Sequence, residues 1–438
     1  MKHGETRTIV IESVDKKGCG RGQVNERPAS VRFALPGETV EASYVGRGKG
    51  VKRFRVDRLV EASPHRTEPR CPNAGRCGGC AWQHVDYAHQ LELKRGLVNA
   101  AFERAGLQPP VAAVEPCPQL YHYRNRMDWC VGPQGQIGLK EPGRWNAYLN
   151  IEECHLQSPE AMEVLATVRG WMKDNGVKPW NAFHDKGYLR YVVVREGKNT
   201  GERLVTLVTH RGDLPARNDL IERLAPYTTS VWHGVNPEVT DLSVAPKTEL
   251  VAGAPHLVES VGNFRYQIGP NSFFQTNTTM AERLLSAVRE HVTEARPETV
   301  LDLYCGVGFF TVGIADLVRR AVGVELDDQA VSAARRNALL NGAANTEFAA
   351  TSAESLVWER ERPDLVIVDP PRAGLHPKVA STLLERAPRR IVYVSCNYES
   401  FVRDFGALGT QYDLTSLQAL DLFPHSPHVE LVTLLERQ

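Results

Sequence analysis

From about residue 298 to the end of the chain, short apolar segments alternate with stretches of helical periodicity. This alternation constrains the fold more than any other feature of the sequence, because strands that alternate with helices build a parallel sheet covered on both faces. The sequence therefore predicts a doubly wound, Rossmann-like α/β domain. The strand candidates are Thr299–Leu303, Ala321–Val324, Leu365–Val368, Ile391–Val394 and Leu431–Leu435.

The first of these strands leads into a glycine turn that is suited to a ligand. Gly306 and Gly308 let the backbone approach a bound molecule closely, and Glu325, at the end of the next strand, is placed to bind ribose hydroxyls. A dinucleotide site would want a third glycine where Thr311 stands. Asp302, just before the turn, is instead typical of S-adenosylmethionine sites, which we expect here. A tight turn without a ligand is the alternative.

Polar groups stand at the ends of three further strands, at the edge where ligands bind in open α/β sheets. Asp369 begins the sequence Asp-Pro-Pro-Arg, and Cys396 follows the fourth strand directly. A thiol at that edge is a candidate nucleophile, although a lone cysteine is more often a core residue. His425, His428 and Glu430 precede the last strand, and any of them could act as a general base.

The N-terminal part of the chain has a different character. The whole chain carries 52 Lys and Arg against 52 Asp and Glu, yet residues 1–70 hold 15 and 9, an excess of six positive charges. Short β-branched segments and glycine turns over residues 6–62 predict a small β-barrel of the size of an OB-fold. Five cations in the loop Arg47–Arg55 suit contact with phosphate, so a polyanion partner is expected.

The composition is that of a globular protein of several domains. The chain has 438 residues, of which 42% are hydrophobic and 24% charged. The most apolar stretch, residues 300–318, contains Asp302 and Asp316, which a membrane helix would hardly place there. The N-terminus shows no apolar core of a secretory signal, so we expect a cytoplasmic protein with no membrane partner.

Nine cysteines in a long chain favour metal or catalytic roles over disulfides. Four thiolates suit either zinc or an iron–sulfur cluster, and spacing alone does not separate the two. Cys117 and Cys130 are weaker candidates for the fourth ligand. The expected metal ligands are Cys71, Cys77, Cys80 and Cys154.

The run Tyr121–Arg126 interleaves aromatic and cationic side chains, a pattern that holds unpaired RNA by stacking and phosphate contact. Arg124 and Arg126 are the RNA-binding candidates, and Arg190 and Arg195 are weaker ones. Without further support, an exposed strand would be the better interpretation of this run.

Taken together, these motifs resemble those of the bacterial RNA (uracil-5-)-methyltransferases that carry an N-terminal TRAM domain and an iron–sulfur cluster. The resemblance covers nearly the whole chain, and the motifs are specific jointly rather than singly. The matching segments are 71–84, 272–277, 369–374, 395–397 and 423–430.

The resemblance implies a role for each site residue. Cys396 would add to carbon 6 of a uracil, which makes carbon 5 nucleophilic toward the methyl group of S-adenosylmethionine, and Glu430 would remove the carbon-5 proton. The target base would leave its stack to reach the pocket. The four cysteines would hold a [4Fe-4S] cluster with a structural or RNA-docking role. Positions of the cofactor pocket are matched by Gln275, Tyr304, Glu325 and Asp369.

We therefore expect three domains: a TRAM-type barrel over 1–62, an α+β region with the iron–sulfur site over 63–262, and the methyltransferase domain over 263–438. The expected function is methylation of a specific uridine at carbon 5, in 23S rRNA, by a monomer. The alternatives are a tRNA uridine-5 methyltransferase, a cytosine-5 RNA methyltransferase and a non-catalytic RNA-binding factor. The Asp369–Arg372 motif lacks the second cysteine common in cytosine-5 enzymes.

Overall fold

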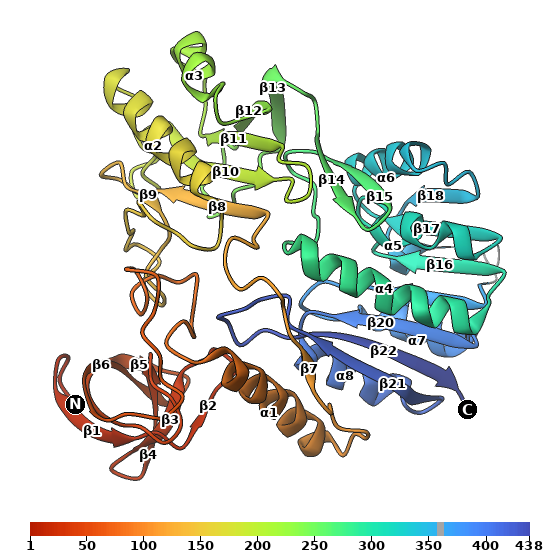
Figure 1. Cartoon of the computed structure of the whole chain (residues 1–438), viewed down its shortest axis with the longest axis horizontal. Coiled ribbons are helices and arrows are strands. Elements are labelled where there is room, and N and C mark those ends of the chain that lie inside the picture. The colour runs from red at the N-terminus through yellow and green to blue at the C-terminus, as the bar shows by residue number, and fades with distance from the viewer. Residues whose placement is uncertain (357–362) are drawn as a thin grey trace.

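The computed structural model describes residues 1–356 and 363–438. Its strands form two six-stranded sheets, one two-stranded sheet and one eight-stranded sheet. The N-terminal sheet lies at one end of the molecule, the eight-stranded sheet at the other, and the second six-stranded sheet beside both (Figure 1). No helix within these residues is both long and apolar enough to cross a membrane.

The N-terminal sheet curls around its own small core, which includes Ile9, Val31, Val40 and Phe54. The expectation of a basic loop over Arg47–Arg55 is wrong in one respect: these residues form a hairpin that turns at Lys49 and Gly50. In order across the sheet, the strands are β1 (Thr6–Val10), β5 (Thr39–Gly48), β6 (Val51–Glu61), β4 (Arg27–Arg32), β3 (Gly20–Val24) and β2 (Ser13–Val14).

The central sheet packs one face against two helices, α2 (Pro159–Asp174) and α3 (Arg217–Leu224). Its strand β10 is buried along its whole length, as expected of a strand in the middle of a covered sheet. Strands β10 and β11 of this sheet pair antiparallel as a hairpin. The order is β13 (Lys247–Gly253), β12 (Ser230–Val235), β11 (Arg203–Thr209), β10 (Leu189–Glu196), β8 (Arg126–Val131) and β9 (Ile137–Gly138).

The C-terminal sheet confirms the doubly wound α/β prediction. Its first five strands run parallel, the sixth is antiparallel to the fifth, and the seventh is antiparallel to the sixth. All five strand candidates from the sequence are present, and three strands were missed: β18, β21 and the two-residue β7. The order is β18 (Thr346–Ala350), β17 (Arg320–Glu325), β16 (Thr299–Leu303), β19 (Leu365–Val368), β20 (Arg390–Ser395), β22 (Glu430–Arg437), β21 (Tyr412–Leu420) and β7 (Val114–Glu115).

Two helical layers cover this sheet. One contains α4 (Thr278–Ala295), α5 (Phe309–Gly313) and α6 (Asp328–Leu340), and the other contains α7 (Pro377–Arg386) and α8 (Tyr398–Leu408). A small hairpin lies beside α6. The remaining short elements are β14 (Leu257–Val261), β15 (Phe264–Ile268), η1 (Ala315–Leu317) and η2 (Ala353–Ser355).

The helix α1 (Tyr87–Ala105) packs on the C-terminal sheet although it lies far upstream in the chain. Val98 and Phe102 belong to the same core as α7, α8 and the sheet. Val114 of β7 pairs with Ala419 of β21, which covers a strand that would otherwise be an open edge. The N-terminal half of the chain thus completes both a helical layer and the sheet of the C-terminal half.

The face of α1 toward the C-terminal domain carries buried polar groups that apolar periodicity does not predict. Lys94 and Asp421 are both fully buried and form an ion pair. Lys94 also donates to the carbonyl oxygen of Phe423 (3.0 Å), and Asp421 accepts from the hydroxyl of Tyr87 (2.9 Å). The pair therefore fixes α1 to the loop that leads into β22.

We expect Lys94→Met to lower the free energy of unfolding by about 3–5 kcal/mol, because it leaves the Asp421 carboxylate buried without a counter-charge. Asp421→Asn in the same chain should restore a large part of that loss. The control Lys173→Met, at an exposed position of α2, should change stability by less than about 1 kcal/mol. Urea unfolding of the three variants measures these free energies. Equal stability of Lys94→Met and Lys173→Met would contradict the prediction.

Candidate active site

The strand directions bring the predicted catalytic residues to one edge of the C-terminal sheet. Strands β19 and β20 are parallel and end at this edge, with Asp369 and Cys396 directly after them. Strand β22 is antiparallel to β20 and begins at the same edge with Glu430. The register pairs Ser395 with Leu431, so Cys396 lies opposite Glu430.

Three carboxyl groups share this edge. Burial raises the pKa of Asp302 and of Asp369 to about 7 each, and the charge of Asp302 raises that of Asp369 further. Burial and the neighbouring Asp369 raise the pKa of Glu430 well above its usual range. The side-chain amide of Gln275 donates to Asp369 (3.3 Å), which holds that carboxyl in place.

The thiol of Cys396 is half-buried between β20 and α8. Burial raises its pKa to about 11, the nearby Glu430 and Asp369 add to this effect, and Arg372 opposes it. The free protein therefore holds Cys396 mainly as the thiol at neutral pH. Arg372 is the cation that favours the thiolate, and although its motif was singled out in the sequence, this role was missed.

The glycine turn after β16 has the geometry of a ligand loop. Gly306 and Gly308 both have a positive φ, 55° and 81°, and so does Tyr304, at 67°. The Gly306 N–H donates to the carboxylate of Glu325 (3.2 Å), so the turn is fixed to the end of β17. Asp302 accepts two hydrogen bonds from Thr311 through its Oδ2, while its Oδ1 is buried with no partner among residues 1–356 and 363–438.

The two histidines before β22 differ from Glu430 in their surroundings. Burial lowers the pKa of His425 and of His428 to about 4, so both rings are neutral at pH 7. The backbone N–H of His425 donates to the side chain of Gln90 on α1, and the Nδ1 of its ring contacts the same side chain. Its carbonyl oxygen accepts from the N–H groups of Ala81 and Trp82.

The four predicted metal ligands are free thiols on two segments that lie side by side. The Asn73 side chain donates to the Glu153 carbonyl (3.4 Å), and Cys77, Cys80 and Cys154 pack against the same core. No three His, Cys, Asp or Glu side chains of residues 1–356 and 363–438 are arranged as a metal site. The rival ligands donate elsewhere: Cys117 to Gln119 and Cys130 to Gly138.

The arginines singled out for RNA contact have different environments. Arg190 and Arg195 are buried, and their guanidinium groups donate to backbone carbonyls, so expecting RNA contact from them is wrong. Arg126 is paired with Asp128 (2.7 Å). Arg124 lies beside the active-site edge, where its charge helps to lower the pKa of His428.

This strand order, with a glycine turn after the first strand and an acidic residue at the end of the second, defines an S-adenosylmethionine-dependent methyltransferase domain. A family model described as tRNA (Uracil-5-)-methyltransferase matches residues 247–438. An uncharacterized RNA methyltransferase of Caldanaerobacter subterraneus is 34% identical over the full length of both chains. The tRNA (uracil(54)-C(5))-methyltransferase of Pyrococcus horikoshii is 38% identical, covering 92% of this chain and 95% of that one.

The crystal structure of a Pyrococcus abyssi tRNA (uracil-54, C5)-methyltransferase with S-adenosyl-L-homocysteine superposes with a TM-score of 0.82. It is 33% identical and covers 98% of this chain and 99% of that one. The present chain belongs to the RNA (uracil-5-)-methyltransferase family. It is an enzyme that methylates uracil at carbon 5 in RNA with S-adenosylmethionine, which excludes the non-catalytic and cytosine-5 alternatives.

Labelling of Cys396 with iodoacetamide should become about tenfold faster per pH unit over pH 7–10, because only the thiolate reacts and its pKa lies near 11. Arg372→Gln should slow labelling at pH 8 by about 3- to 10-fold, since it removes the cation that stabilises the thiolate. Peptide mass mapping identifies Cys396 among the nine cysteines. Lys378→Gln, an exposed change on α7, is the control, and equal slowing by both would count against this role of Arg372.

Proposed function

We propose that Cys396 is the nucleophile and Glu430 the base of the reaction. The observation that supports both assignments is the β20–β22 register, which sets the two residues opposite each other at the ligand-binding edge of the sheet. Gln275, Tyr304, Glu325 and Asp369 are the proposed cofactor-pocket residues. Asp369 and Gln275 contact each other, and Glu325 holds the glycine turn.

In the proposed reaction, the Cys396 thiolate forms a bond to carbon 6 of uracil, and the electrons of the carbon 5–carbon 6 double bond move into an enolate. S-adenosylmethionine supplies the methyl group that carbon 5 accepts. Glu430 then removes the carbon-5 proton, the double bond forms again, and the Cys396 thiolate leaves carbon 6. Arg372 stabilises this thiolate before addition and after elimination.

We propose tRNA as the RNA, with uridine 54 as the target position. The sequence motifs favour 23S rRNA, with tRNA as an alternative, and the relatives support tRNA better. The Pyrococcus horikoshii and Pyrococcus furiosus relatives, 38% and 36% identical, are both named as tRNA uracil-54 enzymes.

Tritium release from RNA labelled at uridine carbon 5 tests the substrate and the two roles. Wild-type enzyme with S-adenosylmethionine should release tritium from a tRNA transcript, and a transcript with cytidine at position 54 should release none above background. Cys396→Ala should abolish release, because no adduct can form. Glu430→Gln should lower release by at least about 100-fold, the usual scale for loss of a general base.

The covalent adduct separates the two residues. With Glu430→Gln, the adduct should accumulate as a protein–RNA band that survives denaturation, and with Cys396→Ala no band should form. Release from 23S rRNA transcripts and none from tRNA would overturn the proposed RNA. Adduct formation by Cys396→Ala would overturn the proposed nucleophile.

We also propose that Cys71, Cys77, Cys80 and Cys154 hold a [4Fe-4S] cluster, and that the chain has a TRAM-type barrel over 1–62, a cluster-bearing region over 63–262 and the catalytic domain over 263–438. Four free thiols on two adjoining segments have the donor chemistry of such a cluster. The cluster would tie the two segments together. Because methyl transfer needs no electron, the proposed cluster would have a structural role.

Protein purified without oxygen should contain iron and acid-labile sulfide in about equal amounts. Cys80→Ala should lose most of both, because it removes one of four ligands. Cys130→Ala is the matched control, since this buried thiol donates to Gly138 and should not affect metal content. Zinc without sulfide would support the zinc alternative and overturn the cluster.

A further inference from the structure

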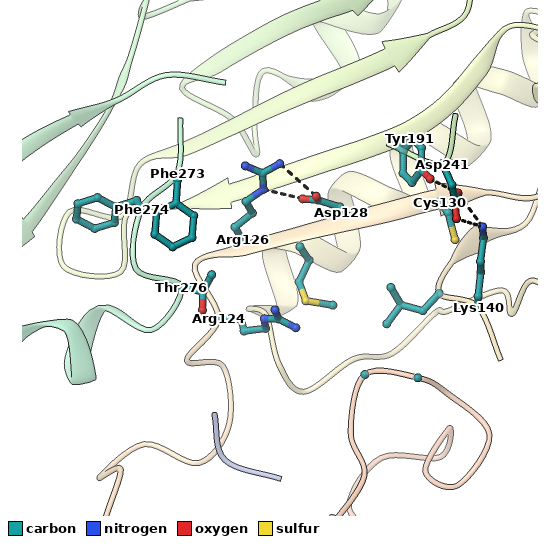
Figure 2. A pocket seen from close by; sticks show the side chains of 14 residues that line it. Arg124, Arg126, Asp128, Cys130, Lys140, Tyr191, Asp241, Phe273, Phe274 and Thr276 are labelled. Carbon is teal, nitrogen blue, oxygen red and sulfur yellow. Dashed lines mark hydrogen bonds and ion pairs between the residues drawn. The ribbon is translucent and has the colours of Figure 1, made fainter. Parts of the chain in front are cut away.

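A pocket of about 560 Å³ lies between the central sheet and the segment that carries Gln275. Arg124, Thr276, Phe273 and Lys140 are among the residues that line it (Figure 2). Its size is within the range of pockets that hold a small ligand of nucleotide size. The pocket contains none of the residues proposed for catalysis, so the reaction does not account for it.

The polar groups of this pocket are unevenly satisfied. Asp128 is neutralised by Arg126, and Asp241 accepts from Lys140 and from the hydroxyl of Tyr191. In contrast, the Nε of Arg124 and the hydroxyl of Thr276 are buried and have no hydrogen-bond partner among the described residues. Figure 2 shows these two side chains next to each other on one wall of the pocket.

These unpaired atoms specify the chemistry of the ligand. A guanidinium only donates hydrogen bonds, and a buried donor without an acceptor is costly. The nearby carboxylates already have partners, so they do not serve as acceptors for these atoms. A ligand that binds at this wall should therefore supply hydrogen-bond acceptors, as a phosphodiester or a base carbonyl does. Phe273, whose side chain is 66% exposed, adds an aromatic surface at the pocket.

The pocket is also next to the active site. Gln275 donates to Asp369 at the catalytic edge, while Thr276, the next residue, lines the pocket. The Asn125 side chain donates to the Gln275 carbonyl (2.7 Å), so the segment beside Arg124 and the segment of Thr276 are fixed to each other. An RNA strand with its target base at Cys396 would have a neighbouring nucleotide within reach of this wall.

We propose that this pocket binds one unpaired nucleotide of the substrate RNA, distinct from the uridine that is methylated, with Arg124 and Thr276 donating to its phosphate or base oxygens. The inference rests on the proposed substrate being RNA with unpaired bases around the target. Thr276 acts as a positioning residue for RNA and takes no part in the transfer of the methyl group.

The test measures binding without turnover. Full-length Cys396→Ala protein, with S-adenosylhomocysteine, is titrated with target-arm RNAs in which each unpaired nucleotide except the target is replaced, one at a time, by an abasic site. An abasic site at one of these positions should weaken binding of the RNA. Thr276→Val in the same background should weaken binding of the unaltered RNA by about threefold to tenfold, the value of one hydrogen bond.

The decisive result is non-additivity. When the abasic site replaces the nucleotide that occupies the pocket, Thr276→Val or Arg124→Gln should weaken RNA binding little further. When the abasic site is at any other position, the losses of affinity from the abasic site and from the substitution should multiply. Lys173→Met, on an exposed part of α2, should bind all RNAs as the parent does. The KM for S-adenosylmethionine should not change in Thr276→Val with Cys396 intact.

Full additivity at every position, or wild-type binding by Thr276→Val, would overturn the proposal. Tritium release by the enzyme with Cys396 intact reports the substrate separately. Tritium release together with full additivity would overturn the proposed nucleotide binding in the pocket, while the proposed tRNA substrate would still be supported. If tRNA gives no release, the proposed substrate fails, and the same scan on the RNA that does release tritium decides the pocket.

Discussion

The arrangement of this enzyme depends on a fully buried ion pair between Lys94 and Asp421. Two charges can be buried only if each satisfies the other and the remaining polar atoms find partners. Here the Phe423 carbonyl and the Tyr87 hydroxyl complete the set. Because Asp421 precedes the loop that ends at Glu430, the pair links a helix from the N-terminal half to the position of the proposed base.

The same loop is also held from the cysteine-rich segment. The His425 carbonyl accepts from the N–H groups of Ala81 and Trp82, directly after Cys80, and Gln90 of α1 contacts both His425 and the Trp82 carbonyl. A loss of order around the four cysteines would therefore reach the catalytic loop through backbone hydrogen bonds. If the proposed cluster is present, this contact gives it a physical route to affect the reaction without transferring an electron.

The electrostatics of the edge suit an enzyme that becomes active when its substrates bind. In the free protein, burial favours the neutral forms of Asp302, Asp369, Glu430 and Cys396. The sulfonium of S-adenosylmethionine is a cation, and a cation near carboxyl groups favours their ionised forms. A cofactor bound with its sulfonium at this edge would therefore favour the form of the proposed base that can accept a proton.

The sequence by itself determined the α/β class, five strands of the C-terminal sheet and the motifs at their ends, because periodicity and strand-end chemistry are local properties. Strand β18 was missed since its residues are half-exposed and unpatterned, and β21 since alternation with solvent weakens its apolar signal. Lys94 and Gln90 reached buried positions against local expectation. Only the tertiary structure decided that α1 and β7 complete the C-terminal domain, that Arg190 and Arg195 are internal, and that Arg124 and Thr276 share a wall, because each of these facts depends on partners far apart in the chain.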